Sequence, residues 1–476
     1  MAQNSTDSAR ITDILDRQRA ATNTEGQPSA ELRRQRIQAV IDMLVAHHEG
    51  LVEAMDADFG GRPRGYSLMN DVLGTITSLK NSRDNLETWM APQDRAVFAP
   101  YDQLGAKAHV RYQPKGSVGI LGTWNAPLFT VLSPLAGVLA AGNRAVLKPS
   151  EVVPRTAALL AEIVDASLDP DVVAIVTGGP DVAELLTSLP FDHFVFTGSS
   201  SVGKLVMANA AKNLVPVTLE LGGKSPTVIG LSADIDAAAF RIAVAKTTNA
   251  GQLCVNPDTT YVPRELLEQF VASTAKVYAE LLPTIEGNPD AVSVVNERHA
   301  ARVDGYIDDA VARGARVEIA PAGAMPSEGG RRPLRMVVDP PSDSVIRSEE
   351  IFGPAMVVLG YDNLDDVLAE INSGPRPLAL YYFGTDAEEQ AKVLDHTLSG
   401  GVTINDVMMH PGLQDAPFGG VGASGMGHYN GREGFEEFSH ARAVFEASAV
   451  ELRRDWGVLP PYADGFYTAM ASQVTP

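Results

Sequence analysis

The sequence predicts an α/β protein that is built on parallel sheets and has more than one domain. Short apolar runs alternate with helix-like segments over residues 117–229, and the same alternation starts again after Gly223 and continues to about Thr403. Strands that alternate with helices of about ten to fifteen residues form βαβ units, which assemble into parallel sheets. A length of 476 residues is also typical of roughly two or three domains.

The composition is that of an ordinary globular chain, with 45% hydrophobic and 20% charged residues. Disorder, collagen and coiled coil are excluded as the main architecture, because each requires a strong compositional bias. The chain has 38 Lys and Arg against 59 Asp and Glu, a net charge of −21. Such a charge repels nucleic-acid phosphates and anionic lipids. We therefore expect neither a nucleic-acid partner nor a membrane partner.

The amino-terminal residues and the cysteine count indicate the compartment. Residues 1–10 are polar and lack the apolar core of a secretory signal peptide. Cys254 is the only cysteine, so the chain forms no internal disulfide and no cysteine-rich metal site. The neighbouring His47 and His48 do not form a zinc-binding pattern either, and we expect no metal. A reducing compartment follows, and we expect a cytoplasmic protein.

A charge-free run over residues 116–143 exceeds the roughly 20 residues that a membrane span requires. Gly122, Asn125 and Pro127 interrupt this run where a turn from strand to helix would fall. We therefore expect a buried strand followed by a buried helix.

The elements are expected in the following order. Apolar residues at helical spacing between Glu31 and Met55 predict a helix, and the polar segment before it is expected to fray. The apolar runs predict strands at 118–121, 145–147, 172–176, 194–196, 216–221, 227–229 and 260–262, and helices at 235–248 and 265–282. Residues 323–332 form a loop-like run.

Two glycine patterns are candidates for phosphate binding. Residues 198–205 fit a Walker pattern except that Leu205 lacks the hydroxyl that would bind magnesium, which disfavours an NTPase. Gly198 nevertheless follows a strand and begins a helix, so free N–H groups there could bind an anion. A serine helix cap fits the same residues equally well. Residues 420–425 match a dinucleotide fingerprint, but no strand precedes them, so we expect a tight loop.

Three residues are candidates for chemistry, each with a structural alternative. Cys254 lies in a loop after a helix, where it is either a nucleophile or a small buried hydrophobe. Glu220 ends an apolar strand, where desolvation would make it a general base, or it caps the next turn at the surface. Asn125 lies at a strand end before a helix, where its amide stabilises an oxyanion or caps the helix.

Together these motifs resemble the aldehyde dehydrogenase superfamily. The matching segments follow the family order: 124–127, 148–151, 196–199, 220–226, 251–254, 349–354 and 417–427. The short amino terminus and the Gly-Met-Gly ending of the last segment resemble the class 3 branch. Residues 211–220 resemble the bacterial coniferyl-aldehyde dehydrogenases within it.

The resemblance implies the aldehyde dehydrogenase fold. It places a Rossmann-like NAD(P)-binding domain at 1–93 and 116–222 and an α/β catalytic domain at 223–425. The resemblance also implies a small β oligomerisation arm at 94–115 and a bridging segment at 426–450. Residues 451–476 would form a C-terminal tail. Members of this branch are usually dimers, so a homodimer is expected.

The resemblance also implies a covalent mechanism. Cys254 attacks the aldehyde, and the Asn125 side chain and the Cys254 N–H hold the oxyanion. After hydride transfer to the nicotinamide, Glu220 activates the water that hydrolyses the thioester.

The cofactor implied by the resemblance is NAD, with NADP as an alternative. Lys148 and Glu151 would bind the adenosine ribose, and a carboxylate there disfavours the 2′-phosphate of NADP. The other cofactor residues implied are Trp124, Gly198, Ser199, Gly203, Leu221, Glu350 and Phe352.

Departures from the family pattern concern substrate shape. Thr123 and Ala126 flank the motif of Asn125, and Asn256 and Thr259 follow the cysteine, at positions where other residues are usual. Ala126 would enlarge a pocket and Asn256 would offer a hydrogen bond, so we expect a bulky aromatic aldehyde such as a hydroxycinnamaldehyde or a formylbenzoate.

Several alternatives remain open at this point. They are a CoA-acylating aldehyde dehydrogenase, an enzyme for medium- or long-chain aliphatic aldehydes, a thiol esterase, and an inactive binding protein with the same fold.

Overall fold

The computed structural model describes residues 2–327 and 330–476. The chain divides into two compact units. The larger unit extends to Trp89 and continues from Pro114 to Ser439, and the smaller unit comprises residues 90–113 and 440–476. The candidate site lies entirely within the larger unit.

The first sheet of the larger unit has six strands in the order β15-β7-β6-β3-β4-β5. All pairs are parallel except β15 with β7. The strands are β3 (Ser117–Leu121), β4 (Arg144–Lys148), β5 (Val173–Ile175), β6 (His193–Thr197), β7 (Val217–Glu220) and β15 (Gly425–Met426). The five parallel strands confirm the expected runs between 117 and 221. They are mostly apolar and almost completely buried, because helices cover both faces of a parallel sheet.

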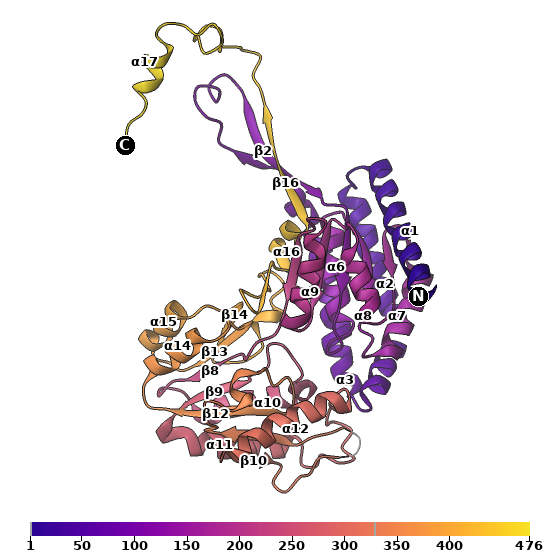
Figure 1. Ribbon diagram of the computed structural model, residues 1–476, viewed down its shortest axis with the longest axis vertical. Helices are drawn as coiled ribbons and strands as arrows, with labels where there is room; N and C mark the ends of the chain where they lie inside the picture. The colour runs from indigo at the N-terminus through magenta and orange to yellow at the C-terminus, as the bar shows by residue number, and fades with distance from the viewer. Residues whose placement is uncertain (1, 328–329) are drawn as a thin grey trace. The chain divides into compact units, whose positions relative to one another are not determined.

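Helices surround this sheet (Figure 1). They are α1 (Ala2–Glu25), α2 (Ala30–Phe59), α4 (Gly74–Asp84), α6 (Phe129–Ala140), α7 (Pro154–Ser167), α8 (Pro180–Ser188) and α9 (Ser200–Ala211), with the shorter α3 (Arg64–Ser67), a π-helix (Leu68–Leu73), α5 (Leu86–Met90) and α16 (Gly431–Glu437). The charge-free run at 116–143 forms β3 and α6, as expected. In the described part of the chain, no helix combines the length and apolar character that crossing a membrane requires.

The expectation that the segment before residue 31 frays is wrong, because α1 is a helix that packs on the core. Ile11, Ile14 and Leu15 are buried against strand residues such as Phe194. Their spacing of three and four residues places all three on one side of a helix. This short apolar stripe is easy to overlook in a segment that is otherwise polar.

The second sheet has seven strands in the order β10-β11-β12-β9-β8-β13-β14. Only the pair of β10 with β11 is antiparallel. The strands are β8 (Thr227–Ile229), β9 (Thr259–Pro263), β10 (Arg316–Ala320), β11 (Leu334–Val338), β12 (Ala355–Tyr361), β13 (Ala379–Phe383) and β14 (Gly401–Ile404).

Helices α12 (Glu297–Ala312), α14 (Leu364–Ser373) and α15 (Ala387–His396) share one core with this sheet. Helices α10 (Ile235–Thr247) and α11 (Leu267–Leu281) pack against each other. A 3₁₀ turn at Thr248–Gly251 follows α10, and another at Arg264–Leu266 precedes α11. The other short elements are α13 (Val345–Ser348) and a 3₁₀ turn at His410–Gly412. A second α/β layer after Gly223 is thus confirmed.

The smaller unit contains a three-stranded sheet in the order β1-β2-β16. Its strands are β1 (Gln93–Arg95), β2 (Lys107–Pro114) and β16 (Ser439–Glu446), and α17 (Phe466–Ala471) lies in the tail. The β1–β2 pair is the expected hairpin, and β16 adds a third strand from the far end of the chain. Phe98 stacks on Phe445 with ring centroids 6.0 Å apart, which joins the hairpin to the end of β16.

Candidate active site

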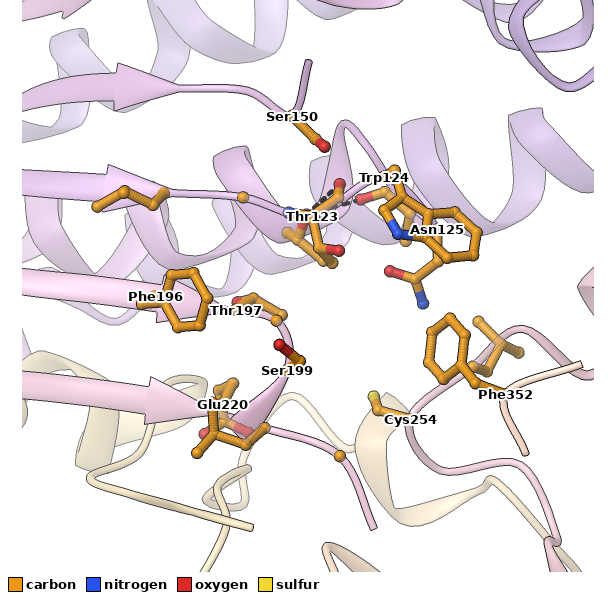
Figure 2. Close-up of a pocket in the computed structure, with 18 of the residues that line it drawn as sticks. Thr123, Trp124, Asn125, Ser150, Phe196, Thr197, Ser199, Glu220, Cys254 and Phe352 are labelled. Carbon is orange, nitrogen blue, oxygen red and sulfur yellow. Dashed lines mark hydrogen bonds between the residues drawn. The ribbon is translucent and has the colours of Figure 1, made fainter. Parts of the chain in front are cut away.

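A cavity of about 1390 Å³ lies within the larger unit. Lys148, Gly198 and Glu220 reach it from the carboxyl ends of β4, β6 and β7. In doubly wound sheets, ligands bind at these strand ends. All of the predicted site residues except Gly203 line the cavity. They are Asn125, Glu220, Cys254, Trp124, Lys148, Glu151, Gly198, Ser199, Leu221, Glu350 and Phe352. Figure 2 shows Asn125, Cys254, Glu220 and Phe352 arranged around one space.

Gly203 is the exception, since it does not line the cavity. It is buried in α9, and a Cβ atom at this position would lie 2.8 Å from the side chain of Leu221. The absence of a side chain therefore allows α9 to pack closely on the residue that follows β7.

Cys254 follows a tight turn at the end of α10. Asn249, Ala250 and Gly251 adopt successive left-handed conformations, with φ of 50°, 53° and 72°. A Cβ on Gly251 would collide with the carbonyl oxygen of Gly353, so this position requires glycine. Consecutive left-handed residues are strained, and such strain is typical of functional sites. The turn carries the partly exposed Cys254 thiol to the wall of the cavity.

Burial, with smaller contributions from the carboxylates of Glu350 and Glu220, raises the pKa of the Cys254 thiol to about 12. The thiol is therefore protonated at neutral pH, and it must lose this proton to act as a nucleophile.

Asn125 is buried, with 4% of its surface exposed, and it joins two loops. Its Nδ2 donates to the carbonyl of Gln252 at 3.0 Å, and its own carbonyl accepts from Asn249 Nδ2 at 3.0 Å. It does not cap a helix, because α6 begins only at Phe129. An amide nitrogen carries two protons, so one proton of Nδ2 remains for a ligand. The Asn125 amide nitrogen faces the side of the cavity where Cys254 lies (Figure 2).

Glu220 ends β7 with only 2% of its surface exposed, which rules out a surface carboxylate that caps a turn. Within the described residues, neither of its carboxylate oxygens has a hydrogen-bond partner. Burial raises the pKa of Glu220 well above its usual range. Gly419 lies beside it, and a Cβ on that glycine would lie 3.1 Å from Glu220 Oε1. A desolvated, unpaired carboxylate is suited to accept a proton.

Polar groups suited to a dinucleotide line the other end of the cavity. Lys148 Nζ donates to Glu151 Oε2 at 2.9 Å, and the Glu151 carboxylate remains 42% exposed. Ser199 caps α9 by accepting from the Val202 N–H at 3.4 Å, so the helix cap considered above is present. The other N–H groups in the first turn of this 12-residue helix have no partner within the helix, so they remain available to an anion.

Glu350 and Phe352 lie on one loop that the partly buried Arg302 holds. Arg302 donates to the carbonyls of Glu350 and Ile351 at 2.9 and 2.8 Å. Burial raises the pKa of Glu350 to about 8, and the charge of Asp258 adds to this effect. Phe352 has a left-handed φ of 44° and packs edge-on against Trp124, with centroids 5.4 Å apart.

The proposed substrate role of Asn256 is wrong. Its Nδ2 donates to the Ala245 carbonyl at 2.7 Å, and the residue is buried outside the cavity lining. Ala126, in contrast, does line the cavity, together with Phe129 and Met408. Among residues 2–327 and 330–476, no group of three or more His, Cys, Asp and Glu side chains is placed to hold a metal ion.

Several residues that support the site were not predicted from the sequence. Arg62, Asp71, Asn249, Gln252 and Arg302 hold loops around the cavity through hydrogen bonds. Their partners are mostly backbone carbonyls that lie far away in the sequence. The only signal available was the position of Asn249 and Gln252 within the segment of Cys254.

Comparisons with known proteins agree with this geometry. The model of the aldehyde dehydrogenase family matches residues 2–444. A Caulobacter vibrioides protein named "Probable coniferyl aldehyde dehydrogenase" is 46% identical over 470 residues, which cover 98% of this chain and 97% of that protein. The coniferyl aldehyde dehydrogenase of a Pseudomonas species is 44% identical and covers 92% of this chain and 90% of its own length.

Solved structures give the same result. The substrate-bound state of Staphylococcus aureus AldH superposes with a TM-score of 0.90 at 32% identity, covering 98% of this chain and 99% of that one. Mycobacterium tuberculosis aldehyde dehydrogenase complexed with NAD+ superposes with a TM-score of 0.83 at 30% identity, covering 93% and 91%. The chain belongs to the aldehyde dehydrogenase family.

Proposed function

We propose that this enzyme oxidises a bulky aromatic aldehyde to the carboxylic acid, with NAD as the acceptor and Cys254 as the nucleophile. One observation carries the proposal. The Cys254 thiol, the Asn125 amide and the unpaired Glu220 carboxylate line a single cavity that also contains groups suited to a dinucleotide.

The chain's own residues act in sequence. The Cys254 thiol releases its proton to solvent, the sulfur bonds to the aldehyde carbon, and the carbonyl oxygen becomes an oxyanion that accepts from Asn125 Nδ2 and the Cys254 N–H. Removing one such donor costs roughly 3 kcal/mol of transition-state stabilisation. After the substrate carbon is oxidised, Glu220 takes a proton from water, the resulting hydroxide attacks the thioester, and the carbon–sulfur bond breaks. Cys254 is then free, and the acid carries the oxygen of the water.

The cavity residues fit a nicotinamide dinucleotide. Lys148 and Glu151 would bind the adenosine ribose. The first turn of α9, after Gly198 and Ser199, would bind the pyrophosphate. Glu350 would bind the second ribose. Leu221 and Phe352 would supply apolar contacts beside Trp124. When bound, this cofactor accepts the hydride from the substrate carbon. The exposed carboxylate of Glu151 favours NAD over NADP, because it repels a 2′-phosphate.

Two observations support the assignment of an aromatic substrate: the residues that line the cavity and the names of the relatives. Ala126, Phe129, Leu73 and Met408 provide apolar surface in the cavity that Cys254 also lines, and Ala126 leaves room that a larger side chain would fill. The most similar relatives reported above are named coniferyl aldehyde dehydrogenases. A hydroxycinnamaldehyde therefore fits better than an aliphatic chain. The unpaired Glu220 favours hydrolysis of the thioester over transfer to CoA.

The experiment is a panel of aldehydes assayed by NADH absorbance with NAD and NADP in parallel, with and without CoA. We expect the highest kcat/KM with coniferaldehyde and NAD, and free acid as the product in both arms. A clear preference for hexanal, or an acyl-CoA product, would overturn the substrate or the reaction, respectively.

We further propose a cytoplasmic homodimer. The six-stranded sheet would bind the cofactor and the seven-stranded sheet would carry Cys254, while the smaller unit would pair with a second copy. Exposed aromatic residues in that unit, including Phe98, Tyr462 and Tyr467, provide apolar surface for this contact. Light scattering after gel filtration should give twice the chain mass of 50.6 kDa.

A further inference from the structure

A completely buried ion pair lies beside the loop that carries Asn125. Arg62 Nη2 donates to Asp71 Oδ2 at 2.7 Å, and both side chains are 0% exposed. Arg62 follows the end of α2, and Asp71 lies in the π-helix Leu68–Leu73. Burying two charges is costly unless other hydrogen bonds satisfy their remaining donors and acceptors. The partners of these remaining groups therefore indicate what the pair holds in place.

Both partners bind the same loop. Arg62 Nη2 also donates to the carbonyl of Asn125 at 3.3 Å. Asp71 Oδ1 accepts from the N–H groups of Leu128 and Phe129 at 3.1 and 3.4 Å, at the start of α6. The ion pair thus forms hydrogen bonds with both ends of the segment 125–129.

The opposite side of Asn125 is held by the nucleophile loop. Its carbonyl accepts from Asn249 as well as from Arg62, and its Nδ2 donates to the carbonyl of Gln252. Gln252 Nε2 in turn donates to the carbonyl of Asn249 at 2.9 Å. The two donors on one carbonyl set the orientation of the Asn125 peptide, and with it the direction of the side chain.

Arg62 has little freedom to move. Its guanidinium lies 4.9 Å from the ring centroid of Phe59 and 4.9 Å from that of Tyr66. Arg62 does not line the cavity, so it would act on the reaction through its neighbours, and among them Asn125 is the one with an amide donor placed for the oxyanion.

We propose that Arg62 is a positioning residue that aims the Asn125 amide at the oxyanion of the reacting aldehyde. This inference rests on the proposed function, since it presumes that Asn125 binds that oxyanion. Both of these hydrogen bonds come from the single nitrogen Nη2, and the contacts of the planar guanidinium with Phe59 and Tyr66 hold this nitrogen between its two acceptors. An ammonium on the shorter lysine side chain lacks the planar group that makes these contacts.

The test is Arg62→Lys, which keeps the charge and the pair with Asp71. We expect kcat with coniferaldehyde and NAD to fall about 10- to 100-fold, because a misplacement of about 1 Å can cost 100-fold, while KM changes less than about threefold. In an Asn125→Ala background the same change should cost less than about twofold, because its effect passes through Asn125. An equal loss in both backgrounds, or full activity of Arg62→Lys alone, would overturn the proposal.

Two further variants separate positioning from stability. Arg62→Met with Asp71→Asn removes the buried charges, a change that is often neutral for stability, and it keeps an acceptor for Leu128 and Phe129. We expect normal thermal unfolding and the same loss of kcat, and full kcat in this folded variant would contradict the role of Arg62. The matched control is Arg33→Lys, because Arg33 is equally buried and donates to the Pro28 and Ala140 carbonyls away from the cavity. It should alter stability without altering kcat.

Wild-type enzyme assayed in parallel distinguishes the two hypotheses. If the wild type forms no NADH with any aldehyde, the proposed function fails. If the wild type is active and the Arg62 variants match it, only the positioning role fails.

Discussion

Replacing Glu220 with Gln separates the oxidation of the aldehyde from the hydrolysis of the thioester. Gln is nearly the same size as Glu but cannot take a proton from water. Glu220 is 2% exposed, and no described side chain pairs with its carboxylate, so the substitution breaks no ion pair or side-chain hydrogen bond. General-base catalysis contributes about 10²–10⁴-fold, so we expect steady-state kcat to fall by about 10³-fold.

The assay is stopped-flow NADH absorbance with coniferaldehyde and NAD. Because oxidation precedes hydrolysis, Glu220→Gln should release one NADH per chain in a burst and then turn over slowly. The wild-type kcat should rise as the pH rises through the elevated pKa of Glu220, since the base acts only when ionised. The variant should lack this rise. A steady-state rate close to that of the wild type, or the loss of the burst itself, would refute the assignment of Glu220 to hydrolysis.

The same substitution changes stability in a predictable direction. Burial raises the pKa of Glu220 in the folded state, so between the ordinary carboxyl pKa of about 4.3 and the raised value only the folded state keeps the proton. Wild-type stability therefore falls as the pH rises through this window, by roughly 1.4 kcal/mol per pK unit. Glu220→Gln has no proton to lose, so its free energy of unfolding should exceed that of the wild type increasingly up to the raised pKa.

Three further predictions concern the oxyanion, the cofactor and the first helix. Asn125→Ala should lower kcat about 10²- to 10³-fold with little change in KM, because it removes one donor to the oxyanion; an unchanged kcat would exclude Asn125 from that role. Glu151→Gln should raise the ratio of kcat/KM for NADP over NAD about tenfold, since it removes the charge that repels the 2′-phosphate; a ratio that stays the same would mean that another group sets the preference. Leu15→Ala should lower the free energy of unfolding by about 2–5 kcal/mol in a urea titration, because Leu15 is 1% exposed in the core of the first sheet. A loss below about 0.5 kcal/mol, which is typical of a surface substitution, would show that α1 does not stabilise that core.

The parallel strands and the site at their ends followed from the sequence for one physical reason. A strand buried on both faces is mostly apolar, so a carboxylate at its end, such as Glu220, stands out, whereas Lys148 was expected only from the resemblance to the family. Parallel strands then bring their carboxyl ends to one edge, which places these residues around a common cavity. Cys254 was conspicuous because it is the only cysteine.

What the sequence analysis missed depends on long-range contacts. Helix α1 is mostly polar, and its burial depends on Ile11, Ile14 and Leu15 meeting a sheet that begins 100 residues later. Asn256 was expected at the substrate, but its amide donates to the carbonyl of Ala245, a backbone group with no sequence signal. The third strand of the small sheet, β16, pairs with a hairpin more than 300 residues away.

The support for Asn125 was missed for the same reason. Arg62 and Asp71 lie in a polar stretch that is typical of an exposed loop. Only the folded chain shows that they form a buried pair next to residues 125–129.

The central claim is that the substrate is oxidised while bonded to Cys254. The most direct measurement is the mass of the acid-quenched Glu220→Gln protein after reaction with coniferaldehyde and NAD, followed by peptide mapping. Because the chain has one cysteine, the account predicts one adduct per chain on the peptide that contains Cys254, with the mass of the aldehyde less two hydrogens. An adduct with the full aldehyde mass, no adduct despite NADH release, or undiminished NADH formation by Cys254→Ser would contradict it.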